Sequence, residues 1–190
     1  LRPLRRMVTG ALRTRKLRRA RRVLCDPRDL TCDQLKAFAL TKPLDEAEKR
    51  LVGAISLKVS ASDYMYVDGW STSYLTAGLS AGRVIRASLD AAGKVVAKGV
   101  ILDFPCGYGR ILRFLTEMFP DSRVVGVEID KEALNFCRRT FSVEGYESRP
   151  VRSFTSLCLP HKFDLIWSGS LITHLDEQAA LDLLAFFCRH

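Results

Sequence analysis

The sequence predicts an α/β fold with a doubly wound, mostly parallel sheet and a helical amino-terminal region before it. From residue 94 onwards, apolar runs of strand length alternate with segments of helical periodicity, the order that produces a parallel sheet with helices on its faces. The first apolar run ends in VILDFPCGYGR (100–110), where an acid and two glycines separate a strand from a helix. We therefore expect a basic arm (1–24), a helical region with an aromatic loop (25–93) and the sheet (94–190).

Length and composition describe one moderate globular unit. The chain has 190 residues, 47% of them hydrophobic, and no apolar run reaches the roughly 18 residues that span a bilayer. The first residues are basic and contain no apolar secretory signal, so we expect a cytoplasmic protein. The six cysteines lack the paired spacings of a zinc site or a disulfide framework, which predicts reduced thiols and no metal site.

The net charge of +9 is concentrated in the arm. Residues 1–24 contain ten Lys or Arg and no Asp or Glu, so residues 25–190 together carry a net charge of about −1. Leu4, Val8 and Leu12 recur at helical spacing among the arginines. This pattern is typical of a basic helix on RNA or on an anionic membrane surface, and equally of a solvated tail.

Two helices are expected between the arm and the aromatic loop. The capping-box spacing of Thr31 and Gln34 predicts the first. Pro43 suits the first turn of a second helix from Leu44, whose expected buried face is Leu44, Ala47, Leu51 and Ile55.

The aromatic loop SASDYMYVDGWSTSY (60–74) leads into a third helix, which glycines at positions 78 and 82 are expected to interrupt. The apolar face of this helix comprises Tyr74, Leu75, Leu79 and Ile85. Three loop aromatics are candidates for a lid over a bound ligand, or alternatively for packing onto a nearby helix: Tyr64, Tyr66 and Trp70.

Four strands are expected: Val95–Leu102, Arg123–Glu128, a weak strand near Arg149–Arg152, and Phe163–Trp167. The first and last are apolar runs typical of strands that are buried on both faces. Asp130 and Asp176 are the expected N-caps of the two later helices, and Pro120 ends the earlier one. The expected core faces of these three helices are Ile111, Leu112, Leu115, Met118 and Phe119; Leu134, Cys137 and Phe141; and Leu181, Leu184 and Phe187.

The loop after the first strand is the candidate ligand site, because ligands bind at the carboxyl ends of the strands in such a sheet. Gly107 and Gly109 allow the backbone to turn sharply against a ligand, and the following helix directs its first amides there. A dinucleotide fingerprint requires a third glycine where this chain has Leu112, which disfavours a nicotinamide-dependent oxidoreductase.

Two acids at strand ends indicate the kind of ligand. Asp103 ends the first strand, where it would repel a pyrophosphate and attract a cation. Glu128 ends the second strand 21 residues after Gly107, where a carboxylate can accept hydrogen bonds from both hydroxyls of a ribose. Together they fit a nucleoside with a cationic tail.

The segments VILDFPCGYGRILRFL, VVGVEIDKEALNFCRRTF and FDLIWSGSLITHLD resemble the class I S-adenosylmethionine-dependent methyltransferases. The resemblance covers residues 99–190, and 61–98 only as a helical approach. It implies a Rossmann-like sheet and S-adenosyl-L-methionine as the cofactor. The family usually has seven strands and this chain holds the first four, so we expect a fragment whose fourth strand has an unpaired, apolar edge.

The resemblance also implies cofactor contacts. Asp103 and the loop with Gly107 and Gly109 would bind the methionine part, Glu128 would hold the ribose, and Ile129 would lie against the adenine.

Further implied contacts depart in part from the family pattern. The backbone around Trp167 and Ser168 would close the site. Pro105 stands where the family's loop usually begins with glycine, which stiffens the loop and removes one amide donor. Ser153 and Thr155 stand where the family often has an acid that faces the adenine amino group.

His174 follows the fourth strand and is expected near the mouth of the site. As a neutral imidazole it could accept a proton from a methyl acceptor, or it could simply be hydrogen-bonded near the start of the last helix. Cys106 is expected to pack rather than react, because no basic residue beside it would generate a thiolate.

The expected function is S-adenosylmethionine-dependent methyl transfer, with a small molecule or a glycan or lipid precursor as acceptor. The sulfonium itself activates the methyl group, so the protein needs mainly to align and desolvate the reactants, and the motifs do not identify the acceptor. The alternatives are a non-catalytic nucleotide-binding or scaffolding module of the same fold and a dinucleotide-dependent oxidoreductase, which Leu112 and Asp103 disfavour.

Overall fold

The computed structural model describes residues 43–66, 71–150, 153 and 156–190. The basic arm, the helix expected to begin at the Thr31–Gln34 capping box, Trp70 and Thr155 lie outside these residues.

Four parallel strands form one sheet in the order β3–β2–β1–β4, which confirms the predicted fold class. Their bounds are β1 Val100–Asp103, β2 Arg123–Glu128, β3 Glu144–Glu147 and β4 Leu165–Trp167. The chain moves outwards from β1 to β3 and then crosses back to place β4 on the other side of β1. The carboxyl ends of β1 and β4 therefore flank the topological switch point of the sheet.

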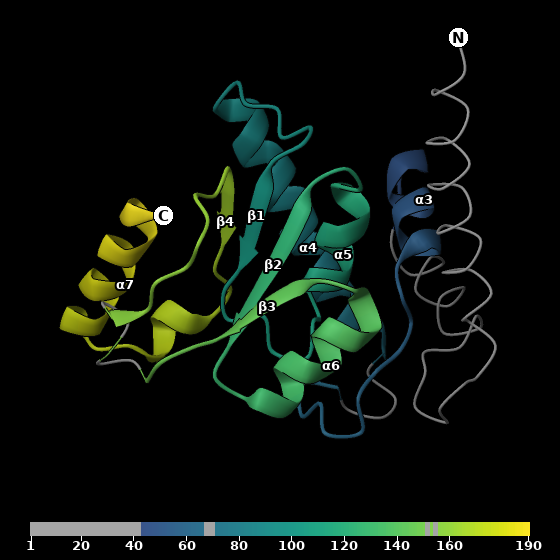
Figure 1. Ribbon diagram of the computed structural model, residues 1–190. Helices are drawn as coiled ribbons and strands as arrows, with labels where there is room; N and C mark the ends of the chain where they lie inside the picture. The colour runs from purple at the N-terminus through teal and green to yellow at the C-terminus, as the bar shows by residue number, and fades with distance from the viewer. Residues whose placement is uncertain (1–42, 67–70, 151–152, 154–155) are drawn as a thin grey trace, which may run out of the picture.

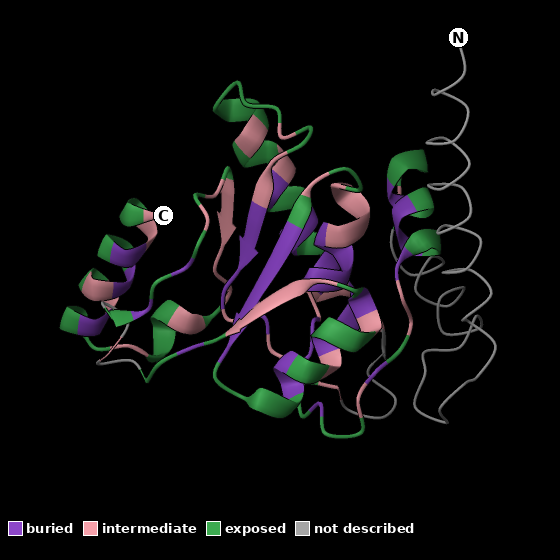
Figure 2. Ribbon diagram, in the orientation of Figure 1, coloured by how far each residue is buried: buried purple, intermediate pink, exposed green. Residues whose placement is uncertain are grey.

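Helices cover both faces of the sheet (Figure 1). On one face lie α4 (Ser71–Ala91), α5 (Leu112–Met118) and α6 (Lys131–Phe141), and on the other lies α7 (Glu177–Arg189), which follows the short 3₁₀ helix η3 (Leu171–His174). A further helix, α3 (Glu46–Ala54), packs outside α4 and α5. The central strands are the most deeply buried part of the molecule (Figure 2).

Each sheet face has its own apolar core. Ile101 and Val124 face α4, α5 and α6, and they pack with Ile85, Leu112 and Leu134 from these helices. The alternate residues Leu102 and Val125 face α7 and pack with Leu183 and Phe186, as the period of two along a strand requires. None of the described helices combines the length and apolarity needed to cross a membrane.

The expected bounds of three strands were wrong. β1 begins at Val100 rather than Val95, which is 90% exposed, because the neighbouring β2 begins opposite Val100 and offers earlier residues nothing to pair with. β3 lies at Glu144–Glu147 rather than near 149–152, since Ser142 in the left-handed region (φ 56°) ends α6 and returns the chain at once. β4 begins at Leu165 and is only half-buried, not buried on both faces.

The expected interruption of α4 by glycines was also wrong, because the helix is continuous. A Cβ added to Gly78 would lie 2.1 Å from the ring of Phe114, and one added to Gly82 would lie 3.1 Å from the sulfur of Met118. These glycines therefore let α4 approach α5 closely rather than break the helix.

The buried faces of α3 and α7 differ from expectation. α3 begins at Glu46 behind a capping box of Asp45 and Glu48, and Glu48 is buried where Ala47 was expected. The Glu48 carboxylate pairs with Arg83 of α4 at 2.6 Å. In α7 the buried residues are Ala179, Leu183 and Phe186, whereas two of the three expected core residues, Leu181 and Leu184, are 53% and 47% exposed.

Other local predictions were confirmed. The β2 strand has the predicted bounds. Asp130 caps α6 by accepting from the amides of Glu132 and Ala133, and Asp176 caps α7 by accepting from Ala179. Asp164 accepts from the Val100 amide at 2.8 Å, which makes it a structural link between the amino ends of β4 and β1.

Candidate functional site

Asp103 is the last residue of β1, in register with Gly126 of β2 and Trp167 of β4. The side chain is 1% exposed, and its Oδ2 has no hydrogen-bond partner among the described residues. Burial raises the pKa of this carboxyl well above 3.8, and the nearby Glu128 carboxylate raises it further. A cationic ligand would relieve both effects, because it supplies a partner for the oxygen and a countercharge.

Glu128, the last residue of β2, holds the glycine loop in place. Its Oε2 accepts from the Gly107 amide at 2.8 Å, and its Oε1 accepts from the amides of Ile129 at 2.7 Å and Asp130 at 3.0 Å. An ionised carboxylate offers about four acceptor positions, so one on Oε2 is left for a hydroxyl. Glu128, the residue expected to bind a ribose, therefore also anchors the glycine loop, a role that the sequence did not indicate.

The two glycines of the loop serve different purposes. Gly107 and Gly109 have positive φ angles of 51° and 78°, which favour glycine. A Cβ on Gly109 would lie 2.3 Å from the Phe141 ring, so this glycine lets the loop pack on α6. A Cβ on Gly107 would meet nothing within 4 Å, so Gly107 borders open space.

Unpartnered polar atoms gather at the switch point. Among the described residues, the buried side-chain atoms without a hydrogen bond are Asp103 Oδ2, Trp167 Nε1 and Ser168 Oγ. Asp103 and Trp167 are direct neighbours across β1 and β4. Buried polar atoms are nearly always hydrogen-bonded in native proteins, so this group indicates a place where a ligand supplies the partners.

The remaining expected cofactor residues are placed less uniformly. Ile129 is 54% exposed beside Glu128 and offers an apolar surface. Pro105 is half-buried between β1 and the glycine loop. Ser153 is not at the end of β3; its amide donates to the Pro150 carbonyl, and its carbonyl accepts from the Ser156 hydroxyl. Ser148 is the residue that follows β3, and its amide donates to the Glu128 carbonyl at 2.8 Å.

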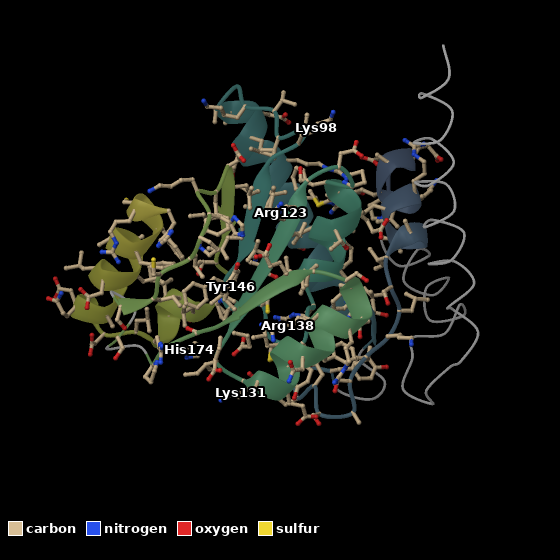
Figure 3. All side chains as sticks on the ribbon, in the orientation of Figure 1. Lys98, Arg123, Lys131, Arg138, Tyr146 and His174 are labelled. Carbon is tan, nitrogen blue, oxygen red and sulfur yellow. The ribbon has the colours of Figure 1, made fainter. Side chains whose placement is uncertain are left out.

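His174 ends η3 and is exposed. Figure 3 shows His174 on the same side of the molecule as Lys131, the first residue of α6, and opposite Lys98 and Arg123, which lie by the amino ends of β1 and β2. It therefore lies on the side to which the carboxyl ends of the strands point.

The lid candidates Tyr64 and Tyr66 differ from each other. Tyr64 is 80% exposed, whereas the Tyr66 ring packs edge-on against Tyr74 at 5.5 Å between ring centres. Cys106 is buried, and its contact with the Cys137 thiol, followed by burial, raises its pKa, which fits packing rather than reactivity.

Sequence reasoning missed a buried polar cluster of Asp63, Tyr74 and Arg113 behind the glycine loop. Arg113 is completely buried within the first turn of α5. The only signal was a charged residue inside an otherwise apolar helical run, which is usually placed in solvent.

A cavity of about 380 Å³ lies elsewhere, along the outer edge of β4 between α4 and α7. Its apolar walls include Val84, Ile166, Leu184 and Phe187. Asp103 and Glu128 do not line it, although Trp167 and Ser168 do. Among the described residues, β4 pairs only with β1, so this edge of the sheet has no strand neighbour.

Part of the chain matches a known family model. Residues 101–190 match a family model described as a methyltransferase domain. No curated protein sequence matches the chain.

Solved structures share the fold. The plantazolicin methyltransferase BpumL is 15% identical, with a TM-score of 0.51 over 84% of this chain and 57% of its own. An S-adenosylmethionine-dependent methyltransferase from Clostridium acetobutylicum is 18% identical, with a TM-score of 0.48 over 58% of this chain and 44% of its own. A TehB-like methyltransferase from Corynebacterium glutamicum is 23% identical, with a TM-score of 0.41 over 60% and 66% of the two chains.

The chain thus spans 44% to 66% of the length of these three proteins. In this chain the sheet has the order β3–β2–β1–β4, with an acid at the end of β1 and the glycine loop after it. Residues 101–190 of this chain therefore match a methyltransferase domain, and the chain shares the fold of the plantazolicin methyltransferase BpumL.

Proposed function

We propose that this protein binds S-adenosyl-L-methionine at the carboxyl ends of β1 and β2 and transfers its methyl group to an acceptor. The observation that carries the proposal is the buried Asp103 carboxyl, whose free Oδ2 lies at the switch point of the sheet beside Glu128. An orphaned acceptor of this kind fits the ammonium of the methionine part, and it does not fit the pyrophosphate of a dinucleotide.

The residues present fit this cofactor at three places. Asp103 would accept from the ammonium, and the free acceptor position on Glu128 Oε2 would take a ribose hydroxyl. The exposed face of Ile129 would cover the adenine. Trp167 Nε1 and Ser168 Oγ supply unused donors on the β4 side.

The protein contributes alignment and desolvation. When bound, the sulfonium supplies an already activated methyl group, so the barrier falls mainly through correct placement of the acceptor. Asp103 and Glu128 hold the two ends of the site at fixed strand ends, and the buried surroundings of Asp103 exclude water. His174, exposed at the end of η3, would accept the proton that the acceptor loses.

Binding of S-adenosylhomocysteine tests the proposal directly. Calorimetry is expected to show binding of S-adenosylhomocysteine and none of NAD. Asp103→Asn is expected to weaken binding by about 1.5–3 kcal/mol, the usual size of a hydrogen bond to a charged group. Asp164→Asn is the matched control, since Asp164 lies at the amino end of the sheet and should leave the affinity unchanged. Equal affinity in both variants would remove Asp103 from the site.

For the acceptor, we favour a small molecule or a glycan or lipid precursor, because residues 25–190 carry almost no net charge. His174→Ala is expected to slow methyl transfer without changing the affinity for S-adenosylhomocysteine. Loss of both together would instead mean a structural role.

We propose separately that the basic arm (1–24) contacts an anionic partner, either RNA or a membrane surface. Deleting residues 1–24 should abolish salt-sensitive binding to RNA or acidic vesicles and leave cofactor binding intact.

A further inference from the structure

A buried cation joins three separate parts of the molecule behind the glycine loop. Arg113 is 0% exposed, and its guanidinium donates to three oxygens. Nε donates to the Gly109 carbonyl at 3.1 Å, Nη1 to the Ser56 carbonyl at 2.9 Å, and Nη2 to the Tyr74 hydroxyl at 3.1 Å. One side chain therefore fixes the glycine loop, the segment after α3 and the helix α4 relative to one another.

The countercharge of Arg113 is reached through a hydroxyl. Among the described residues, no carboxylate forms a direct ion pair with Arg113; the Tyr74 hydroxyl donates to Asp63 Oδ2 at 2.7 Å, and Asp63 is 3% exposed. The guanidinium carbon also lies 5.2 Å from the ring centres of Tyr74 and Phe141, which adds cation–π contact. Burial raises the pKa of Tyr74, so its hydroxyl keeps the proton that it donates to Asp63.

The Asp63 end of this chain of contacts belongs to a turn at residues 60–66. Asp63 Oδ1 accepts from the Met65 amide at 3.0 Å, and the Tyr66 amide donates to the Asp63 carbonyl at 3.1 Å. From the same turn, the Ser62 hydroxyl donates to Glu132 in the first turn of α6 at 2.7 Å. The turn is thus tied both to the buried cluster and to the helix that follows Glu128.

The other end of the chain of contacts is the glycine loop itself. The Gly109 carbonyl accepts from the Arg113 side chain and also from the Arg113 amide at 3.2 Å. The Gly107 end of the loop is held by Glu128, whereas the Gly109 carbonyl is held by these two bonds from Arg113. Displacing the guanidinium would remove one of the two and loosen the loop at Gly109.

We infer that Arg113 is a positioning residue, which couples the turn at residues 60–66 to the glycine loop through Tyr74 and Asp63 and so holds the loop ready for the cofactor. The inference rests on the proposed function for its binding consequence. The coupling follows from the cost of leaving a buried charge with an unmet partner, which makes the three contacts depend on one another. A change at the turn is thus transmitted to Gly109.

Tyr74→Phe tests the coupling with the smallest change, because it deletes the bridging hydroxyl and keeps the ring against Arg113. Hydrogen exchange measured by mass spectrometry is expected to show faster exchange both in the turn (60–66) and in the glycine loop (106–110). The affinity for S-adenosylhomocysteine is expected to fall about 3- to 10-fold, part of what a charged hydrogen bond contributes. Asp63→Asn, which keeps the shape of the side chain, is expected to act in the same direction.

Glu48→Gln is the control for a purely structural effect. It weakens the ion pair between Glu48 of α3 and Arg83 of α4, and neither side chain is hydrogen-bonded to the glycine loop. It should lower the thermal midpoint while leaving loop exchange and affinity as in the parent protein. Faster exchange confined to the turn in Tyr74→Phe, or a lower midpoint with unchanged loop exchange and affinity, would overturn the inference.

Failure of the proposed function would be distinguishable from failure of the coupling. If the parent protein binds no S-adenosylhomocysteine, the proposed function fails, and the exchange of the loop still decides whether Arg113 couples it to the turn. If Tyr74→Phe does not fold, the comparison of Asp63→Asn with Glu48→Gln is made in its place, with the same outcomes.

Discussion

Two acids that end neighbouring strands differ because of what surrounds them. Glu128 accepts from three backbone amides, whereas Asp103 is buried with one oxygen unpartnered. Burial without a partner for that oxygen raises the pKa of Asp103, and the nearby Glu128 carboxylate raises it further. Of two acids at the same edge of the sheet, Glu128 therefore holds the glycine loop, whereas Asp103 keeps an oxygen without a partner among the described residues.

Asp103 gives the protein a pH-dependent stability with a definite sign. Because burial raises its pKa in the folded state above the ordinary 3.8, the folded chain holds the proton more tightly than the unfolded chain. The free energy of unfolding should therefore fall as the pH rises above about 3.8 and level off once the raised pKa is passed. Urea unfolding across this range is expected to show the decline in the parent protein, after subtraction of the curve for Asp103→Asn.

S-adenosylhomocysteine is expected to reduce this decline, since its ammonium would stabilise the charged carboxylate. Superimposable pH curves for the parent protein and Asp103→Asn would contradict the assignment of the proton to Asp103.

At the scale of elements, the glycines of α4 decide how closely two helices approach. The added Cβ of Gly78 would overlap the Phe114 ring, while Gly53 in α3 faces open space. The same residue type in two helices thus has opposite consequences for packing.

Gly78→Ala is expected to destabilise the protein by about 1–3 kcal/mol, the usual cost of overpacking a core. Gly53→Ala is the matched control and should be neutral or stabilising by up to about 1 kcal/mol, because alanine is the better helix former. Thermal or urea unfolding of both variants measures the difference. Equal stability of the two would mean that α4 can move away from α5 without cost.

For the whole molecule, the outer side of β4 is an edge of the sheet without a strand neighbour among the described residues. Leu184 of α7 lines the cavity along this edge, and both Leu184 and Leu181, one turn earlier in α7, are about half exposed. Apolar strand edges promote pairing with other chains.

The 190-residue chain is therefore expected to associate with itself as its concentration rises. Replacing Leu181 and Leu184 together by Lys should reduce this association. Both side chains are about half exposed, so the replacement removes little buried apolar surface from the core. Light scattering over a concentration series measures it, with Leu183→Val, which alters a buried neighbour without adding charge, as the control. A monomeric parent protein would show that this edge does not drive association.

The sequence by itself determined the features that depend on local pattern and short spacing. Each of these features is set by neighbouring residues in the chain. They are the bounds of β2, the helix caps Asp130 and Asp176, and the acid and glycines of the loop after β1. The family resemblance rests on the same local segments, and the family model matches them.

Only the tertiary structure decided what depends on partners distant in the chain. The length of β1 is set by where β2 begins, and Glu48 is buried because Arg83 is within reach. The local sequence predicts that Arg113 is a surface charge, yet it lies in the core. Oxygens of Ser56, Tyr74 and Gly109, from three separate segments, accept its hydrogen bonds there. Hydrogen-bond partners make a buried charge tolerable, and a linear sequence does not state which ones will meet.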